Sequence, residues 1–124
     1  MLLHLTDAST EPLQGQVVRQ IRAKILAGEL TAGADLPSIR KLASELHVSV
    51  ITVQRAYESL EYQGLVHARP GRGFIVSELS KDGRKGIARE RLKEVLEPRI
   101  KSALAEGLSK EEVSRIISAI MKEV

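Results

Sequence analysis

The chain of 124 residues contains no cysteine and no tryptophan, and its only aromatic residues are Tyr57, Tyr62 and Phe74. Without cysteine the protein can form neither a disulfide nor a thiolate metal site. Three aromatic side chains are too few for a surface that binds single-stranded nucleic acid by stacking. No stretch approaches the roughly 20 apolar residues that span a bilayer, and residues 1–7 lack the basic start and apolar run of a signal peptide. We therefore expect a cytoplasmic protein that makes no contact with a membrane.

Constellations that carry catalysis or bind metals are also missing. The three histidines, His4, His47 and His67, are scattered and have no metal-ligand spacing. No Ser-His-Asp order, glycine-rich phosphate loop or pair of catalytic carboxylates stands out, and Gly71-Arg72-Gly73 fits a turn rather than a nucleotide-binding motif. We expect neither an enzyme nor a protein with a metal or another cofactor.

Charge gives only weak support for a nucleic-acid partner. The formal net charge is +3, and residues 1–78 carry eight Lys/Arg and eight Asp/Glu, so the whole excess lies in residues 79–124. A DNA-binding domain with no net charge must gather its basic side chains on one face.

Three helices are predicted in the first half of the chain. Apolar residues at four-residue steps predict a helix from Pro12 to Gly28. Ser38 is a good N-cap for a second helix that ends at His47-Val48, and Ser49 can cap a third that runs to about Gln63.

After these helices the spacing of apolar residues changes from that of a helix to that of extended strands. Leu65–Arg69 and Phe74–Val76 are predicted strands, and Pro70–Gly73 between them is a tight turn. The predicted order is three helices followed by a hairpin, and the second and third helices are only a few residues apart. This is the order of a winged helix-turn-helix. The predicted fold is mainly α with a small β-hairpin wing, and its DNA-binding domain covers residues 10–78.

The remaining chain predicts a linker at residues 79–86 and a helical tail at 87–124. A fourth helix is expected from Ile87 to Glu106, with a bend near Glu97 because Pro98 removes a backbone hydrogen bond. Ser109-Lys110-Glu111-Glu112 is a capping-box pattern that opens a fifth helix.

The apolar stripes of these two helices are too wide to be buried against each other, so a second copy of the chain is the expected partner. The alternative is a monomer in which the tail folds back on its own winged helix. The residues expected at the dimer contact are Leu92, Leu96, Ile100, Leu104, Val113, Ile116, Ile117 and Ile120.

The third predicted helix carries the side chains expected to contact bases. Ser49, Thr52 and Gln54 are polar residues at its start, with Arg55 beside them. A glutamine can bind adenine through two hydrogen bonds, a contact worth about 1–3 kcal/mol of discrimination. The alternatives are that Ser49 serves only as a helix cap and that Thr52 and Gln54 are merely solvated.

Two further groups are candidates for contacts with the DNA backbone. Ser38, Arg40 and Lys41 lie at the start of the second helix, where free amides and the helix dipole attract phosphate. Arg69 and Arg72 flank Gly71 in the hairpin turn, from which an arginine can reach the minor groove or its phosphates. The alternatives are an ion pair between Arg40 and Glu45 and a solvated hairpin tip. Glu58 and Glu61 are expected to point away from DNA.

Over residues 10–78 the chain resembles the GntR family of bacterial regulators. The matching positions are Pro12-Leu13, Gln20-Ile21, Ile25, Gly28, Leu30, Gly33, Leu36-Pro37-Ser38, Arg40, Leu42-Ala43, Leu46, Val48-Ser49, Thr52-Val53, Ala56-Tyr57, Leu60, Gly64-Leu65-Val66, Arg69, Gly71, Gly73, Phe74 and Val76. The resemblance implies DNA contacts by Arg40, Ser49, Thr52, Gln54 and the wing around Gly71. Val50 stands where the family often has a basic residue, and Gln54 where some members have arginine.

The short tail is similar to that of the YtrA-type subfamily, whose members often control transporter operons and dimerise through this segment. The expected function is that of a homodimeric repressor that binds double-stranded DNA at a pseudo-palindromic operator. A small-molecule effector is compatible with this expected function, although the sequence identifies no pocket for one. The rival hypothesis is a protein-interaction module that uses a winged helix without DNA.

Overall fold

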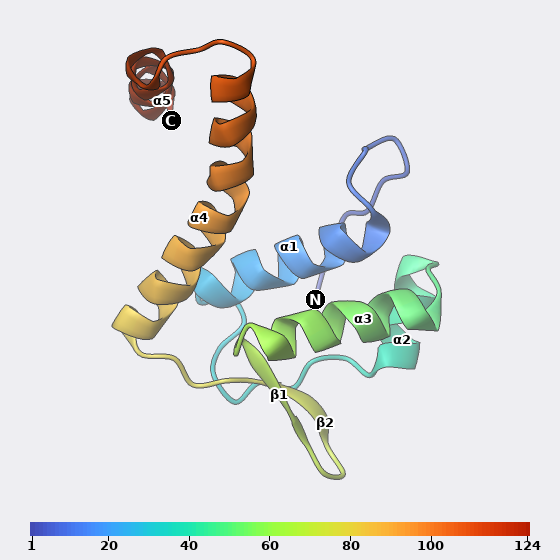
Figure 1. The fold of residues 1–124 in the computed structure, drawn as a ribbon. Coiled ribbons are helices and arrows are strands. Elements are labelled where there is room, and N and C mark those ends of the chain that lie inside the picture. Colours follow the sequence, from blue (N-terminus) through green and yellow to red (C-terminus); the bar gives the residue numbers. More distant parts are fainter. The chain divides into compact units, whose positions relative to one another are not determined.

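The computed structural model describes all 124 residues, which form two compact units, Met1–Arg84 and Lys85–Val124. The first unit contains three helices and a hairpin, and the helix that begins at its end continues into the second unit (Figure 1). The elements are α1 (Leu13–Leu26), α2 (Ile39–Leu46), α3 (Val50–Tyr62), β1 (Val66–Arg69), β2 (Gly73–Val76), α4 (Lys81–Ala105) and α5 (Lys110–Glu123). This order confirms the predicted winged helix-turn-helix with two C-terminal helices. No helix has the length and apolar content needed to cross a membrane.

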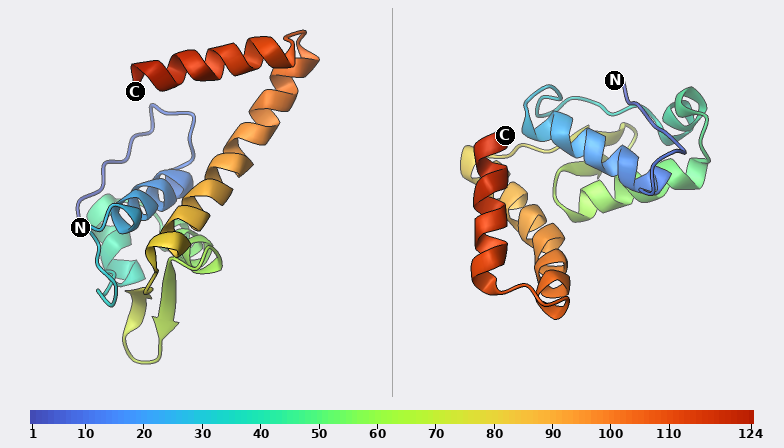
Figure 2. Two further views of the ribbon diagram at one scale, coloured as in Figure 1. Left: turned by 90° about the vertical axis from the view of Figure 1, so that its left-hand side faces the viewer. Right: turned by 90° about the horizontal axis from the view of Figure 1, so that it is seen from above.

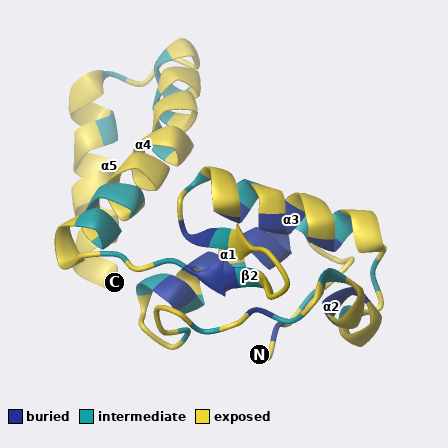
Figure 3. Cartoon of the chain, turned by 90° about the horizontal axis from the view of Figure 1, so that it is seen from below, coloured by how far each residue is buried: buried dark blue, intermediate teal, exposed yellow.

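The core of the first unit lies between α1 and α3, which are side by side (Figures 1 and 2). The apolar stripe expected on the first helix is its buried face, and α3 contributes residues at helical spacing, so the dark core in Figure 3 belongs to this unit. Side chains with no exposed surface include Val17, Ile21, Ile25, Leu42, Val53, Tyr57, Leu60 and Leu65.

The predicted helix starts in this unit are confirmed by their hydrogen bonds. The Ser38 hydroxyl accepts from the Lys41 amide, and the Ser49 hydroxyl accepts from the Thr52 amide, each at 3.1 Å. The stop at the end of α3 is also as expected, because Gly64 is left-handed with φ +79° and lets the amide of buried Leu65 return to the Leu60 carbonyl.

The N-terminal segment is held against α1 by two glutamines, which the sequence analysis did not anticipate. The Gln16 side chain is buried, and its amide group bonds both the N–H and the carbonyl of Thr6. Gln20 makes the same pair of bonds to His4. Each glutamine side chain thus satisfies the backbone N–H and carbonyl of one residue of the segment, as a neighbouring strand would. The segment packs against the first unit, and Leu3 is only 7% exposed.

Strand β2 is paired on both of its edges. Along one edge it is antiparallel to β1, with Val66 opposite Val76 and Arg69 opposite Gly73. Along the other edge residues 33–36 bond to it, through Gly33 N–H to Val76 carbonyl at 2.8 Å and Leu36 N–H to Phe74 carbonyl at 2.9 Å. The chain that leads into α2 is therefore fixed to the hairpin.

Helix α4 starts earlier than expected. It was predicted from Ile87, but it begins at Lys81, so residues 81–86 of the expected linker are helical. Ser80 provides the start, because its hydroxyl accepts from the Gly83 amide at 3.0 Å and this cap offsets the cost of two glycines. The helix also continues through Pro98 without interruption. Glu94 and Pro98 are exposed, so water can reach the carbonyl that loses its bond.

The second unit has well-formed ends but no buried residue. Gly107, at φ +112°, ends α4, and the predicted capping box of Ser109 and Glu112 is present at the start of α5. Neither helix buries a side chain (Figure 3). The apolar residues at least one third exposed include Leu92, Val95, Leu108, Ile116, Ile117, Ile120 and Met121.

His47, which ends α2, is the only residue other than glycine with a positive φ, at 55°. Left-handed backbone costs an L-residue about 1–2 kcal/mol, and glycine avoids most of that cost. We expect His47→Gly to raise the free energy of unfolding by about 1 kcal/mol, measured by urea unfolding at a fixed protein concentration.

Ser44→Gly is the matched control, because Ser44 is exposed in ordinary helical backbone of the same helix. It should lower stability by about 0.5 kcal/mol. Equal destabilisation by both substitutions would contradict the assignment of strain to His47.

Candidate nucleic-acid interface

The start of α2 and the wing line one hollow. It encloses about 390 Å³, and its lining includes Ser38, Arg40, Arg72 and Phe74. The pairing of residues 33–36 with β2 causes this arrangement, because it brings the chain entering α2 alongside the hairpin. Two arginines and the start of a helix thus border the same hollow, and both kinds of group can bind phosphate oxygens.

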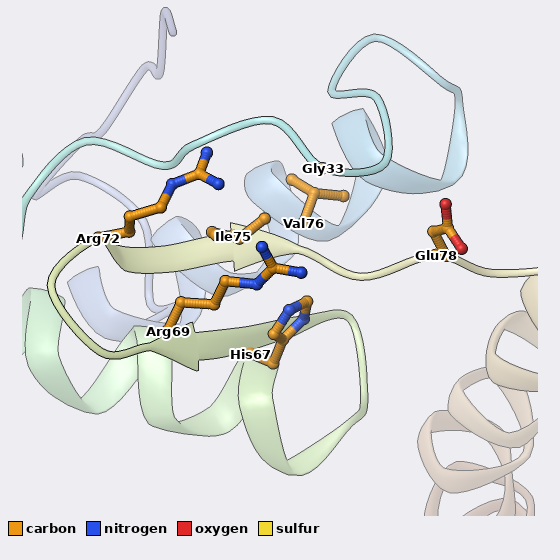
Figure 4. A pocket seen from close by; sticks show the side chains of 7 residues that line it. All are labelled: Gly33, His67, Arg69, Arg72, Ile75, Val76 and Glu78. Carbon is orange, nitrogen blue, oxygen red and sulfur yellow. The ribbon is translucent and has the colours of Figure 1, made fainter.

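A second hollow, of about 360 Å³, lies on the face of the wing (Figure 4). His67 and Arg69 project from β1 on the same side, as residues two apart on a strand do, and Arg72 stands at the turn. Glu78 lines the far end. Arg72 borders both hollows and links the wing to the start of α2.

Arg72 has an acidic partner that the sequence analysis missed. Its guanidinium lies 3.0 Å from the Asp35 carboxylate, and both side chains are at least half exposed. An ion pair in this setting contributes only about 0–1 kcal/mol. It orients Arg72 weakly and can be exchanged for a phosphate.

At the start of α3 the predicted polar contacts are already engaged with each other. The Ser49 and Thr52 hydroxyl oxygens are 2.7 Å apart, and the Ser49 hydroxyl also accepts from the Thr52 amide. Ser49 therefore acts as a cap in this structure. Beside this pair two apolar side chains, Val50 and Ile51, are about half exposed.

Glu58 lies on the same face of α3 as Gln54. The Gln54 amide donates to the Glu58 carboxylate at 3.2 Å, so both side chains lie on one stripe of α3. Residues four apart share a helix face, so the spacing of Gln54 and Glu58 in the sequence already indicated that their side chains lie together. Glu61 instead bonds to the Ala68 amide of the wing at 3.3 Å.

The expected gathering of basic residues is only partly observed. Arg40, Arg69 and Arg72 line the two hollows. Lys41 and Arg55 are exposed on α2 and α3, but neither lines these hollows.

Tyr57 holds the parts of this surface together. Its ring is fully buried on α3 and meets the Phe74 ring of the wing edge to face, with centroids 5.2 Å apart. Its hydroxyl donates to the Pro37 carbonyl, just before α2, at 2.8 Å. Burial, with a smaller contribution from Glu45, raises the pKa of Tyr57 well above that of a free phenol.

We expect Tyr57→Phe to lower the free energy of unfolding by about 1–2 kcal/mol, because it removes a buried hydrogen bond. The raised pKa of Tyr57 also determines how the stability of the protein changes with pH. The phenol stays neutral in the folded chain while it ionises in the unfolded chain above about pH 10, so wild-type stability falls as pH rises through this range. Urea unfolding between pH 7 and pH 11 measures both effects, and Tyr57→Phe should lack this part of the alkaline loss.

Tyr62, which is 94% exposed, supplies the control. Tyr62→Phe should leave stability and its alkaline loss nearly unchanged. If this substitution costs as much as Tyr57→Phe, the structural role given to Tyr57 is wrong.

Comparison with known proteins agrees with the winged helix-turn-helix fold. The family model for bacterial regulatory proteins of the gntR family matches residues 13–76. The HTH-type transcriptional repressor YtrA of Bacillus subtilis (strain 168) is 30% identical over 77% of this chain and 76% of its own length. The uncharacterized HTH-type transcriptional regulator YhcF of the same organism is 33% identical over 85% of this chain and 86% of its own length.

Solved structures match nearly the whole chain. A GntR family transcriptional regulator from Listeria monocytogenes has a TM-score of 0.68 at 30% identity, and the match covers 95% of this chain and 98% of that one. YtrA from Sulfolobus acidocaldarius, a GntR-family transcription factor, has a TM-score of 0.60 at 32% identity, with 98% of each chain covered.

Proposed function

The chain belongs to the gntR family of bacterial regulatory proteins and is a DNA-binding transcriptional regulator, and from this premise we propose that it is a homodimeric repressor of a pseudo-palindromic operator. The observation that carries the proposal is the hollow that Arg40 of α2 and Arg72 of the wing share. The similarity to YtrA, a repressor by its name, supports repression. From the YtrA-type tail we extend the proposal to an operon that encodes a transporter.

The two hollows bind the DNA backbone in this proposal. Arg40, Arg69 and Arg72 contact phosphates. The start of α2, where the Ser38 hydroxyl caps the Lys41 amide, offers its remaining amides to the same strand. The turn at Gly71, with φ +77°, lets the wing follow the minor groove. These contacts set the position of the domain and carry no sequence information of their own.

Helix α3 enters the major groove and reads base edges. Gln54 exchanges its bond to Glu58 for the edge of an adenine, and exposed Arg55 supports the docked helix. The carboxylate of Glu58 disfavours phosphate at the third turn, so α3 meets DNA through its first two turns. Ser49 and Thr52 fix that start through their mutual hydrogen bond and turn their outer surface toward the bases.

A second copy of the chain covers the apolar surface of α4 and α5. Leu92, Ile116 and Ile120 are about half exposed, although such side chains are normally buried. Between the two helices a hollow of about 290 Å³ is lined by Ile100, Leu104, Val113 and Ile117 together with polar residues. A two-fold dimer through this surface presents two α3 helices to major grooves about 34–36 Å apart.

We expect the full-length protein to select one family of inverted-repeat sequences from a random DNA library. Its affinity for that operator should fall steeply with salt, with a log-log slope of about −5 if each subunit neutralises three phosphates. Arg40→Ala should weaken binding to all sequences and make the slope shallower by about 2 per dimer. Gln54→Ala should relax the preference at one base pair in each half-site. Fluorescence anisotropy over a salt series measures these quantities.

Arg19→Ala is the matched control for the loss of one cation, because Arg19 pairs with Glu11 and lines neither hollow. It should change neither the slope nor the sequence preference. Weak binding with little salt dependence would favour the protein-interaction module instead.

The dimer has its own test. The wild-type protein should be a dimer at micromolar concentration by size exclusion with light scattering. Ile120→Glu should yield folded monomers with much weaker operator binding, because it buries a charge in the interface. Arg115→Glu, on the opposite side of α5, should remain a dimer. A wild-type monomer at this concentration would rule out the proposed assembly.

A further inference from the structure

The start of α3 exposes two β-branched apolar side chains where a solvated helix usually has polar residues. Val50 and Ile51 are the first two residues of the helix and are 47% and 48% exposed. The α3 face that packs into the core is formed by other residues, Val53, Ala56 and Leu60, which have no exposed surface. Packing within the chain therefore does not account for Val50 and Ile51.

Val50 and Ile51 are also not needed for the apolar contact that often stabilises the start of a helix. A helix start is often closed by an apolar contact between the residue before the cap and the fourth helical residue. Those positions belong to Val48, which is half-buried, and Val53, which is fully buried. Val50 and Ile51 lie outside that pair.

Both residues lie on the side of α3 that the proposed function turns toward DNA. Val50 is four residues before Gln54 and Ile51 four before Arg55, so each pair shares a stripe of the helix. The polar groups of the same turn, the hydroxyls of Ser49 and Thr52, are bonded to each other. Val50 and Ile51 therefore form the apolar part of the exposed surface of this turn.

The major groove offers one apolar group that distinguishes a base, the C5-methyl group of thymine. We propose that Val50 and Ile51 bind thymine methyl groups and so set part of the operator sequence. This inference rests on the proposed function and assigns one element of its specificity to contacts that involve no hydrogen bond. Each half-site then carries thymine at the base pairs that face the start of α3.

The test uses the full-length protein and the operator selected from the random library. Thymines are replaced one at a time by deoxyuridine, which lacks the methyl group and keeps every hydrogen-bonding edge. At one or two positions in each half-site the substitution should weaken binding about fourfold, the effect of uncovering one methyl group. Deoxyuridine at other positions should have little effect.

Variants then assign the methyl groups to these side chains. Val50→Ala and Ile51→Ala should each bind the thymine operator more weakly and lose sensitivity to deoxyuridine at one position. Val50→Thr, which keeps one methyl group, should retain part of that sensitivity. Arg19→Ala, at a residue outside the proposed interface, is the control and should remain fully sensitive to deoxyuridine. Alanine is a strong helix former, and thermal unfolding checks that the variants are folded.

Several results would overturn the inference. They are an operator without thymine near the helix start, binding that ignores deoxyuridine everywhere, and unchanged deoxyuridine sensitivity in both alanine variants. Conversion of Ile51→Ala from dimer to monomer would assign the patch to a protein contact and would overturn it as well. Specific but methyl-insensitive binding would refute this inference alone, whereas the absence of any selected operator would refute the proposed function with it.

Discussion

The buried side chain of Tyr57 is the contact on which the candidate interface depends. Its ring packs against Phe74 of the wing, and its hydroxyl bonds the Pro37 carbonyl ahead of α2. A phenol without a partner would be costly in this core, so the hydrogen bond selects one position of α3 relative to the other two elements. The packing of α3 against the wing and against the chain that enters α2 follows from this constraint.

The arrangement of charge matters more than its amount. Residues 1–78 carry equal numbers of acidic and basic side chains, and Arg72 is paired with Asp35. Arg40 and Arg72 nevertheless border one hollow, because residues 33–36 bond to the edge of β2. A domain with no net charge can thus still gather several arginines around neighbouring hollows.

The two units are stabilised in different ways. In the first, apolar side chains at helical spacing form a core between α1 and α3, and two glutamines hold the N-terminal segment. In the second, capping bonds at Ser109 and Gly107 define the helix ends, but no side chain is buried. The apolar faces of α4 and α5 therefore gain little stabilisation from burial within a single chain. Those faces were evident from the sequence, because their spacing is local.

The sequence by itself determined the type and order of the elements, through apolar spacing, serine caps at Ser38 and Ser49, and glycines that allow left-handed backbone. These signals are local, but the start of α4 was misjudged, because the cap at Ser80 outweighs two glycines. Only the tertiary structure decided that Arg40 and Arg72 line one hollow and that Gln16 binds the N-terminal segment. Such contacts join residues far apart in the chain, and they depend on how packed elements are oriented, which the propensities of neighbouring residues do not encode.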